Sequence, residues 1–204
     1  TENPLELVRY IETLKGTVWF GVPSIFVYLH KTKSFEGQNL KNLRTIVFGG
    51  EGFPKGTLNY LFGRYGEKIE FVNVYGPTEV TCICSAYKVT KRDFADLKTL
   101  LPLGKIIQFV EFSILTDGAL HKKEEKLGEL LLHGENLSVG YYNDEELTNE
   151  KFIFENKIRM YKTGDLVSLK NNNLHFFGRN DSQIKRMGYR IELQELEFAI
   201  NGIQ

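Results

Sequence analysis

A threonine and a glutamate stand side by side after an apolar run, and together they could address a phosphate and its metal ion. Residues 69–74 are a run short enough for a buried strand, and Gly76-Pro77 ends it because proline has no amide hydrogen to give a sheet. Thr78 and Glu79 follow at the strand's carboxyl end, where open α/β sheets bind ligands. A hydroxyl can donate to a phosphoryl oxygen, and a carboxylate is a hard oxygen ligand for magnesium. The alternative is a polar turn with a solvated glutamate.

Three further stretches hold residue types that suit a nucleotide. The turn at 49–56 is rich in glycine, so a flat ring could lie against it, but Lys55 precedes its last glycine and both the Walker and the GxGxxG patterns fail. Asp165 follows a glycine, and its carboxylate could accept both hydroxyls of a ribose. Arg179 could hold a phosphate through two parallel hydrogen bonds. The alternatives are a strand-to-helix turn, an aspartate in a hairpin turn and a solvated charged hairpin.

Periodicity places these residues in an α/β chain. In the first part, apolar residues at helical spacing alternate with short apolar runs, which predicts a parallel sheet covered by helices on both faces. The later part has short alternating runs between turn residues, which predicts a small antiparallel, barrel-like sheet. The expected helices are 4–15, 23–29, 54–65, 144–151 and 192–200, and the main expected strands are 17–22, 43–48, 69–74, 81–89, 109–115, 127–133, 166–170 and 174–177.

Composition excludes several classes of protein. Among 204 residues, 26 Lys and Arg balance 26 Asp and Glu, so no net charge attracts nucleic acid or an anionic membrane. No apolar run approaches the roughly 20 residues that span a bilayer. Cys82 and Cys84 should face one side of a strand as reduced core thiols, which indicates a cytoplasmic protein. The chain starts without methionine and ends just after a helical pattern, so we expect both ends to be cut from a longer protein.

Four motifs occur in one order and spacing, and together they resemble the adenylate-forming superfamily. That family includes the adenylation domains of nonribosomal peptide synthetases, D-alanine–carrier-protein ligases, acyl-CoA synthetases and luciferases. Trp19, Pro23-Ser24 and Gly188-Tyr189-Arg190 look closest to the D-alanine ligases, and Gln194, where synthetase domains usually have glycine, favours the same branch. The motifs are Asn73-Val74-Tyr75-Gly76-Pro77-Thr78-Glu79, then Gly128-Glu129-Leu130 with Gly140-Tyr141, then Tyr161-Lys162-Thr163-Gly164-Asp165, then Gly178-Arg179-Asn180-Asp181 with Gly188-Tyr189-Arg190.

The resemblance implies a role for each candidate residue. In the implied catalytic group, Glu79 holds magnesium, Thr78 touches the α-phosphate and Arg179 the ribose or phosphate oxygens. Tyr75 stacks on adenine, and Asp165 binds the ribose hydroxyls. The implied nucleotide-binding set is Gly50, Glu51, Asn73, Tyr75, Gly76, Thr78, Asp165 and Arg179. The implied substrate pocket is Phe20, Val47, Gly49, Val74, Cys82 and Ile83.

The same resemblance implies an AMP-forming ligase that uses ATP and Mg²⁺. Such an enzyme activates a carboxylate, here an amino acid, as an acyl-adenylate and passes it to a phosphopantetheinyl carrier-protein thiol. The alternatives are an acyl-CoA or fatty-acid ligase and a nucleotide-binding module without chemistry. The family's phosphate loop, catalytic lysine and upstream substrate-binding aspartate have no match in these residues, so the chain alone is expected to be inactive.

The implied organisation has three parts. Residues 1–90 are expected to be the α/β part of a large adenylation subdomain, and 91–180 a β-rich, barrel-like subdomain. Residues 181–204 are expected to be the hinge and the start of a mobile C-terminal subdomain, with Asp181 as the hinge residue.

Overall fold

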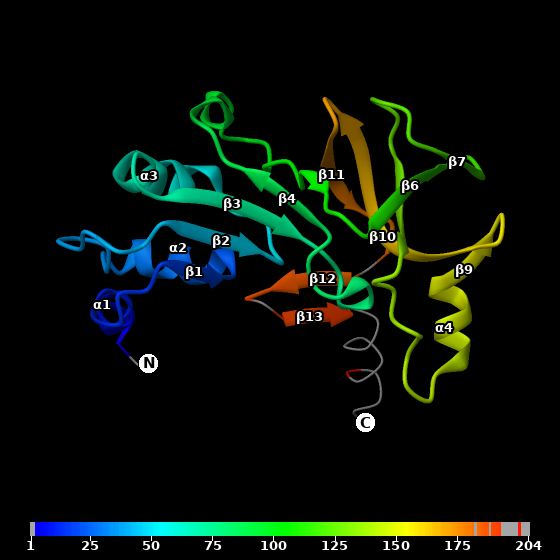
Figure 1. The fold of residues 1–204 in the computed structure, drawn as a ribbon, viewed down its shortest axis with the longest axis horizontal. Helices are drawn as coiled ribbons and strands as arrows, with labels where there is room; N and C mark the ends of the chain where they lie inside the picture. Colours follow the sequence, from blue (N-terminus) through cyan, green and yellow to red (C-terminus); the bar gives the residue numbers. More distant parts are fainter. Residues whose placement is uncertain (1–2, 182, 188, 193–199, 201–204) are drawn as a thin grey trace. The chain divides into compact units, whose positions relative to one another are not determined.

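The computed structural model describes residues 3–181, 183–187, 189–192 and 200 (Figure 1). Contacts between residues divide the chain into two compact units. The first unit comprises Thr1–Asn73, Lys88–Leu101 and Lys185–Tyr189, and the second comprises Val74–Tyr87, Pro102–Ile184 and Arg190–Gln204. Strand β3 (Glu70–Tyr75) runs from the first unit into the second.

The first unit alternates helices and strands, as the apolar pattern predicts. Helix α1 begins where expected, because Asn3 Oδ1 accepts a hydrogen bond from the amide of Leu5 at 3.0 Å and Pro4 occupies the first turn. Strands β1 and β2 are parallel, with Trp19 opposite Ile46. In chain order the elements are α1 (Pro4–Thr13), β1 (Val18–Gly21), α2 (Pro23–Lys31), β2 (Thr45–Gly49), α3 (Lys55–Tyr65) and β3.

Strand β1 is covered on only one face. Trp19 is buried, and its ring centroid lies 4.9 Å from that of Phe26 on α2. The side chains of Val18 and Phe20, which alternate with Trp19, are 60% and 57% exposed. The expectation of helices on both faces is therefore wrong for β1 within the described residues.

The second unit is built around an antiparallel sheet, as predicted for the later part of the chain (Figure 1). Its described strands follow the order β11-β10-β8-β6-β7, with β9 also paired to β10. Helix α4 (Glu145–Lys151) precedes β9. The strands are β6 (Val110–Thr116), β7 (Ala119–His121), β8 (Gly128–Gly134), β9 (Phe152–Glu155), β10 (Ile158–Lys170) and β11 (Asn173–Arg179).

The remaining strands are short. In the first sheet, the order β1-β2-β3-β4-β5 includes β4 (Ser85–Lys88) and β5 (Lys105–Ile106), which pair antiparallel and make that sheet mixed. The charged stretch near the end of the chain forms a two-stranded sheet of β12 (Gln183–Arg186) and β13 (Tyr189–Glu192). Gly188, Gln194 and residues 193–199 of the expected last helix lie outside the described residues. Within the described part, no helix is long and apolar enough to cross a membrane.

Strand β10 is much longer than the sequence pattern indicates. The alternation predicts a strand only at 166–170, with Asp165 at its start, but β10 has 13 residues and begins seven residues before Asp165, at Ile158. Its register against β8 shifts between Lys162 and Leu166, and Gly164 there has a φ of +73°. Gly164 therefore lies at an irregularity inside a continuous strand and does not end the strand. Glycine with a positive φ is common at β-bulges.

The two cysteines do not share a strand face, and that expectation is wrong. Cys82 is exposed and Cys84 is buried, and both are free thiols. Thr81 and Cys82 have φ angles of 55° and 75°, directly after a short 3₁₀ helix at Thr78–Val80. This left-handed pair breaks the strand that the alternation suggests, so β4 starts only at Ser85.

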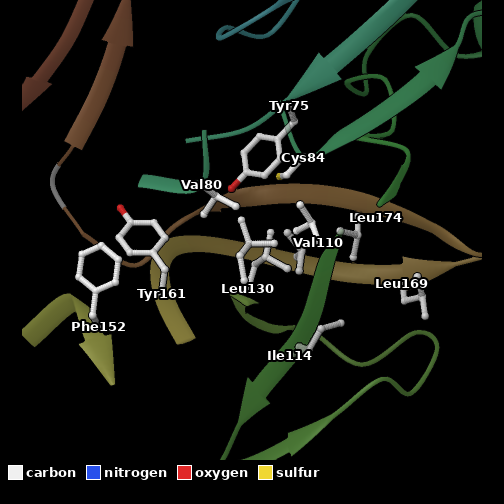
Figure 2. Packing of buried hydrophobic residues seen from close by; sticks show 12 residues of the cluster. Tyr75, Val80, Cys84, Val110, Ile114, Leu130, Phe152, Tyr161, Leu169 and Leu174 are labelled. Atoms are coloured by element: carbon white, nitrogen blue, oxygen red, sulfur yellow. The ribbon is translucent and has the colours of Figure 1, made fainter. Parts of the chain in front are cut away.

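The end of β3 packs into the core of the second unit. Figure 2 shows Tyr75, Val80 and Cys84 lying against Val110 and Leu130 of the antiparallel sheet. All five side chains are at most 8% exposed. The motif that follows β3 therefore has buried apolar residues before it and after it in the sequence, and their burial holds the motif in place.

We expect Gly76→Ala to destabilise the protein by about 1–3 kcal/mol, because this position has no room for a methyl group. A Cβ atom on Gly76 would meet the carbonyl oxygen of Cys82 and would lie 2.8 Å from the amide nitrogen of Cys84. Gly63→Ala is the matched control, since a Cβ at that position in α3 meets nothing within 4 Å and should be neutral or stabilising by up to about 1 kcal/mol. Urea denaturation compares the two variants, and equal free energies of unfolding would contradict the steric argument.

Candidate functional site

Asp165 is held in place by side chains around the irregularity in β10. The Thr163 hydroxyl donates to the carbonyl of Leu130 at 2.7 Å and accepts from the amide of Asp165 at 3.0 Å. The amide of Gly164 donates to a carboxylate oxygen of Glu129 at 3.0 Å. These bonds replace the regular ladder at that point, so the backbone beside Asp165 is fixed although the strand register shifts.

Arg179 lies opposite Asp165 because β11 also contains an irregularity. Val167 pairs with Phe176, but Leu166 pairs with Gly178 and Asp165 with Arg179, so Phe177 is an extra residue on β11. In a regular ladder, Asp165 would face Gly178 instead. The bulge therefore places a guanidinium beside the Asp165 carboxylate.

Five residues of the second unit form one polar cluster, which we call the Asp165 cluster: Tyr75, Thr163, Asp165, Arg179 and Asp181. The Tyr75 hydroxyl donates to Asp165 Oδ2, and Arg179 Nη1 donates to Asp165 Oδ1. Arg179 also donates from Nε and Nη2 to the two carboxylate oxygens of Asp181, at 2.6 Å each, and from Nη2 to the carbonyl of Thr163 at 2.9 Å. Four of the five N–H groups of the guanidinium are thereby used.

Burial and the contacts within this cluster shift the pKa values of Arg179, Tyr75 and Asp181. Burial would lower the pKa of Arg179, but its hydrogen bonds to Asp181 and the charge of Asp165 outweigh burial and raise this pKa. Burial, followed by the negative charge of Asp165, raises the pKa of Tyr75 well above its usual value. Burial would raise the pKa of Asp181, but the hydrogen bonds and charge of Arg179 lower it. These shifts favour a charged Asp181 carboxylate, a charged Arg179 guanidinium and a neutral Tyr75 phenol.

The sequence suggested that Arg179 could make two parallel hydrogen bonds to a phosphate. In this arrangement its guanidinium makes those bonds to another residue. Its two parallel hydrogen bonds go to Asp181. A bidentate contact to a phosphate therefore requires Arg179 to release Asp181 first.

Glu79 lies in the 3₁₀ helix after β3 and is 5% exposed. The Tyr141 hydroxyl donates to its Oε1 at 2.6 Å, and the amide of Ser138 donates to its backbone carbonyl at 2.8 Å. Tyr141 is missing from the residues assigned a role by sequence, although Gly140-Tyr141 is part of one motif. The occurrence of Gly140-Tyr141 in that motif is the only signal in the sequence that points to Tyr141.

The surroundings of Glu79 fit a metal ion that arrives with a nucleotide. Within the described residues, no group of three or more His, Cys, Asp or Glu side chains could hold a metal ion. Mg²⁺ in phosphoryl-transfer sites is commonly held by one or two carboxylates together with substrate phosphates. A single buried glutamate carboxylate matches that arrangement and does not match a metal site built from protein ligands alone.

The first unit holds three residues of the implied nucleotide-binding set, Gly50, Glu51 and Asn73. Gly50 follows β2 with a φ of +86°, and Glu51 Oε2 accepts from the amide of Ser24 at 3.3 Å. Asn73 is buried on β3. Lys55 from the glycine-rich turn is also buried, and its Nζ donates to the carbonyl of Asp96 and the hydroxyl of Thr99 at 3.0 Å each. Residues 49–56 thus use their lysine for a structural contact.

The expected substrate-pocket residues are divided between the two units. Phe20, Val47 and Gly49 lie on β1 and β2 of the first unit. Val74 is buried at the end of β3, and Cys82 and Ile83 follow in the second unit. Cys82 is exposed, and Ile83 is partly buried.

The chain matches the family of AMP-binding enzymes over residues 1–142, and it belongs to that family. The resemblance of its motifs to adenylate-forming enzymes is thereby confirmed. Two curated relatives are the D-alanine–D-alanyl carrier protein ligases of Listeria innocua, 36% identical over 199 residues, and of Bacillus cytotoxicus, 35% identical over 201 residues. The matches cover 97% and 98% of this chain but only 38% and 39% of the relatives, so the chain spans about two fifths of their length.

Solved adenylation domains share the fold. The chain superposes with a TM-score of 0.86 on PA1221, a nonribosomal peptide synthetase protein with adenylation and carrier domains, at 28% identity over 98% of this chain and 40% of that one. It superposes with a TM-score of 0.85 on the adenylation domain AlmE of Vibrio cholerae, solved with glycyl-adenosine-5'-phosphate, at 27% identity over 97% of this chain and 38% of that one. The α/β part and the antiparallel sheet are thus the architecture of adenylation domains.

Proposed function

We propose that the full-length protein is an AMP-forming ligase that activates an amino acid as its adenylate and transfers the aminoacyl group to a carrier-protein thiol. In this reaction the substrate carboxylate attacks the α-phosphorus of ATP, pyrophosphate leaves, and the thiol then takes the acyl group. The observation that carries the proposal is the Asp165 cluster, because it holds a buried carboxylate in a fixed orientation that suits a ribose. The names of the relatives, D-alanine–D-alanyl carrier protein ligases, support an amino acid and a carrier.

Asp165 can accept a ribose diol while it keeps its protein partners. A carboxylate offers about four acceptor sites. In the cluster, Arg179 donates to one carboxylate oxygen of Asp165 and Tyr75 to the other. These two bonds hold the plane of the carboxylate, and each oxygen retains capacity for one ribose hydroxyl. Tyr75 also keeps its proposed contact with adenine.

Thr78, Glu79 and Arg179 supply positioning and charge neutralisation at the phosphates. Magnesium bound with ATP would neutralise phosphate charge, and Glu79 would be its protein ligand. Thr78 would donate to the α-phosphate, and Gly50, Glu51, Asn73 and Gly76 would complete the nucleotide site. Preorganised charges and donors of this kind usually give the largest contribution to catalysis, so no protein nucleophile is required.

The finer organisation is part of the same proposal. The antiparallel sheet corresponds to the barrel-like subdomain, with divisions at 1–90, 91–180 and 181–204. Asp181 is the hinge between the large subdomain and a mobile C-terminal subdomain, and Phe20, Val47, Gly49, Val74, Cys82 and Ile83 line the substrate pocket. The proposed use of ATP supports a cytoplasmic location.

We expect Asp165→Asn to weaken binding of ATP by the full-length protein at least tenfold. The amide removes the charge and puts two donors where the ribose hydroxyls and Tyr75 also donate, and a hydrogen bond to a charged group contributes about 1.5–3 kcal/mol. Calorimetric titration with ATP measures the effect. Asp117→Asn, at a carboxylate that is 89% exposed, is the control and should bind ATP normally. Equal affinities of the two variants would contradict the ribose assignment.

Pyrophosphate exchange across a panel of amino acids and fatty acids tests the substrate class. Exchange with one or a few small amino acids supports the proposal. Exchange with fatty acids alone would identify an acyl-CoA or fatty-acid ligase, and ATP binding without any exchange would identify a module without chemistry.

A further inference from the structure

We propose that Tyr141 is a positioning residue that orients the Glu79 carboxylate for the magnesium ion of the nucleotide. The proposal rests on the proposed function, in which Glu79 is a ligand of that metal ion. Tyr141 would act through Glu79 and would touch neither the nucleotide nor the metal.

The segment at residues 135–141, which we call the strap, is bonded at three points to Glu79 and to Thr81, which follows the 3₁₀ helix of Glu79. Tyr141 donates to the Glu79 side chain at 2.6 Å, and the amide of Ser138 donates to the Glu79 carbonyl at 2.8 Å. The hydroxyl of Thr81 donates to the carbonyl of Asn136 at 2.8 Å. Backbone and side chain of Glu79 are therefore held by the same segment, which restricts the carboxylate more than one bond would.

The position of Tyr141 is also fixed by contacts that do not involve Glu79. Its ring packs edge-on against Phe152, with ring centroids 5.8 Å apart. The amide of Tyr141 donates to the hydroxyl of Thr148 at 2.9 Å, and that hydroxyl donates to the carbonyl of Asp144 at the start of α4. Gly140 has a φ of +143°, and a Cβ there would lie 2.6 Å from Thr148 Cγ2. The Tyr141 hydroxyl therefore contacts Glu79 from a ring and a backbone that have little freedom to move.

Arg159 on β10 also bonds to the strap. Its guanidinium donates to the carbonyl of Ser138 at 2.7 Å and to that of Val139 at 2.9 Å. The same guanidinium lies 4.3 Å from the centroid of the Phe152 ring. The strap is therefore connected to the sheet through Arg159 as well as through Tyr141. Such a shell of supporting contacts is what keeps a metal ligand in one orientation.

A phenol is the suitable donor for this purpose. A lysine or arginine at the same position would orient Glu79 but would neutralise its charge and repel a metal ion. The Tyr141 hydroxyl carries no formal charge, so it donates to Glu79 at 2.6 Å without changing the charge of the carboxylate.

The test compares Tyr141→Phe with Tyr142→Phe in the full-length protein. Phenylalanine keeps the ring against Phe152 and removes only the hydroxyl, and Tyr142 is a neighbouring tyrosine that is 93% exposed. Calorimetry measures ATP binding once with excess Mg²⁺ and once with a chelator. Loss of a contact to a metal ligand typically costs about 10–100-fold in metal affinity or activity. We expect Tyr141→Phe to lose at least about tenfold in affinity for Mg·ATP, with affinity for metal-free ATP unchanged.

A second measurement separates positioning from a structural role. In a Glu79→Gln background, Tyr141→Phe should produce no further change in the dependence of ATP binding on Mg²⁺, because both changes act on one contact. Equal losses with and without Mg²⁺, or affinities equal to those of Tyr142→Phe, would overturn the proposal while the proposed function stands. Absence of ATP binding by the unaltered protein would overturn the proposed function and this proposal together.

Discussion

Replacing Arg179 by alanine is expected to cost the full-length protein about 3–5 kcal/mol of folding stability, because two carboxylates lose their partner. The guanidinium side chain is 13% exposed, that of Asp165 is 6% exposed, and that of Asp181 is 29% exposed. Removing one partner from such a group leaves charge without compensation in a place that water reaches poorly. Urea and thermal unfolding measure the loss.

Lys88→Ala is the matched control for Arg179→Ala. Lys88 Nζ lies 2.6 Å from a carboxylate oxygen of Glu70, as close as Arg179 to Asp181, but these two side chains are 70% and 41% exposed. An exposed ion pair contributes less than about 1 kcal/mol, so Lys88→Ala should have a small effect. Similar losses of stability in both variants would contradict the view that burial makes the ion pairs of the Asp165 cluster contribute more to folding stability than an exposed pair does.

The same substitution should alter the dependence of stability on pH. The pKa of Asp181 is lowered in the folded protein, so its contribution is present above the unfolded value of about 3.9 and is lost as the pH falls towards the lower folded value. Arg179→Ala removes the main cause of that lowered pKa. The stability difference between the unaltered protein and Arg179→Ala should therefore shrink below about pH 4. A difference that is constant between pH 3 and pH 7 would show that Asp181 has no part in it.

Glu79→Gln is expected to lower the rate of adenylate formation in the full-length protein by about 10²–10³, which is typical for the loss of one preorganised transition-state partner. The amide oxygen of glutamine can still accept the hydrogen bond from Tyr141, so the strap should keep its place. What is lost is the negative charge that a metal ion prefers. Pyrophosphate exchange, measured over a range of Mg²⁺ concentrations, gives both the rate and the metal dependence.

A control for Glu79→Gln is available on β6. Glu111 is a carboxylate whose side chain is 69% exposed and whose ion pair with Lys122 spans 3.5 Å. Glu111→Gln should exchange pyrophosphate at the unaltered rate. The assignment of Glu79 fails if Glu79→Gln and Glu111→Gln have equal rates and equal Mg²⁺ dependence, and unfolding curves for both variants exclude a trivial loss of fold.

Much of the local structure follows from the sequence. Apolar spacing predicts the helix and strand succession of the first unit, and proline and glycine predict where β3 ends, since these residues restrict or free the backbone by themselves. The ordered motifs predict the family, which the match over residues 1–142 confirms. The wrong expectation for the cysteines also has a local cause. The left-handed backbone at Thr81 and Cys82 leaves Cys82 exposed and Cys84 buried, and the alternation of apolar and polar residues does not predict that backbone conformation.

Only the tertiary structure decided how the candidate residues meet. Tyr75 and Asp165 are 90 residues apart in sequence and Tyr141 and Glu79 are 62 apart, so periodicity cannot pair them. One extra residue on β11 places Arg179 opposite Asp165, and a ladder without it would present Gly178. Because one residue of register moves every side chain of a strand to a new partner, the charge pattern around Asp165 depends on strand pairing and not on the local sequence.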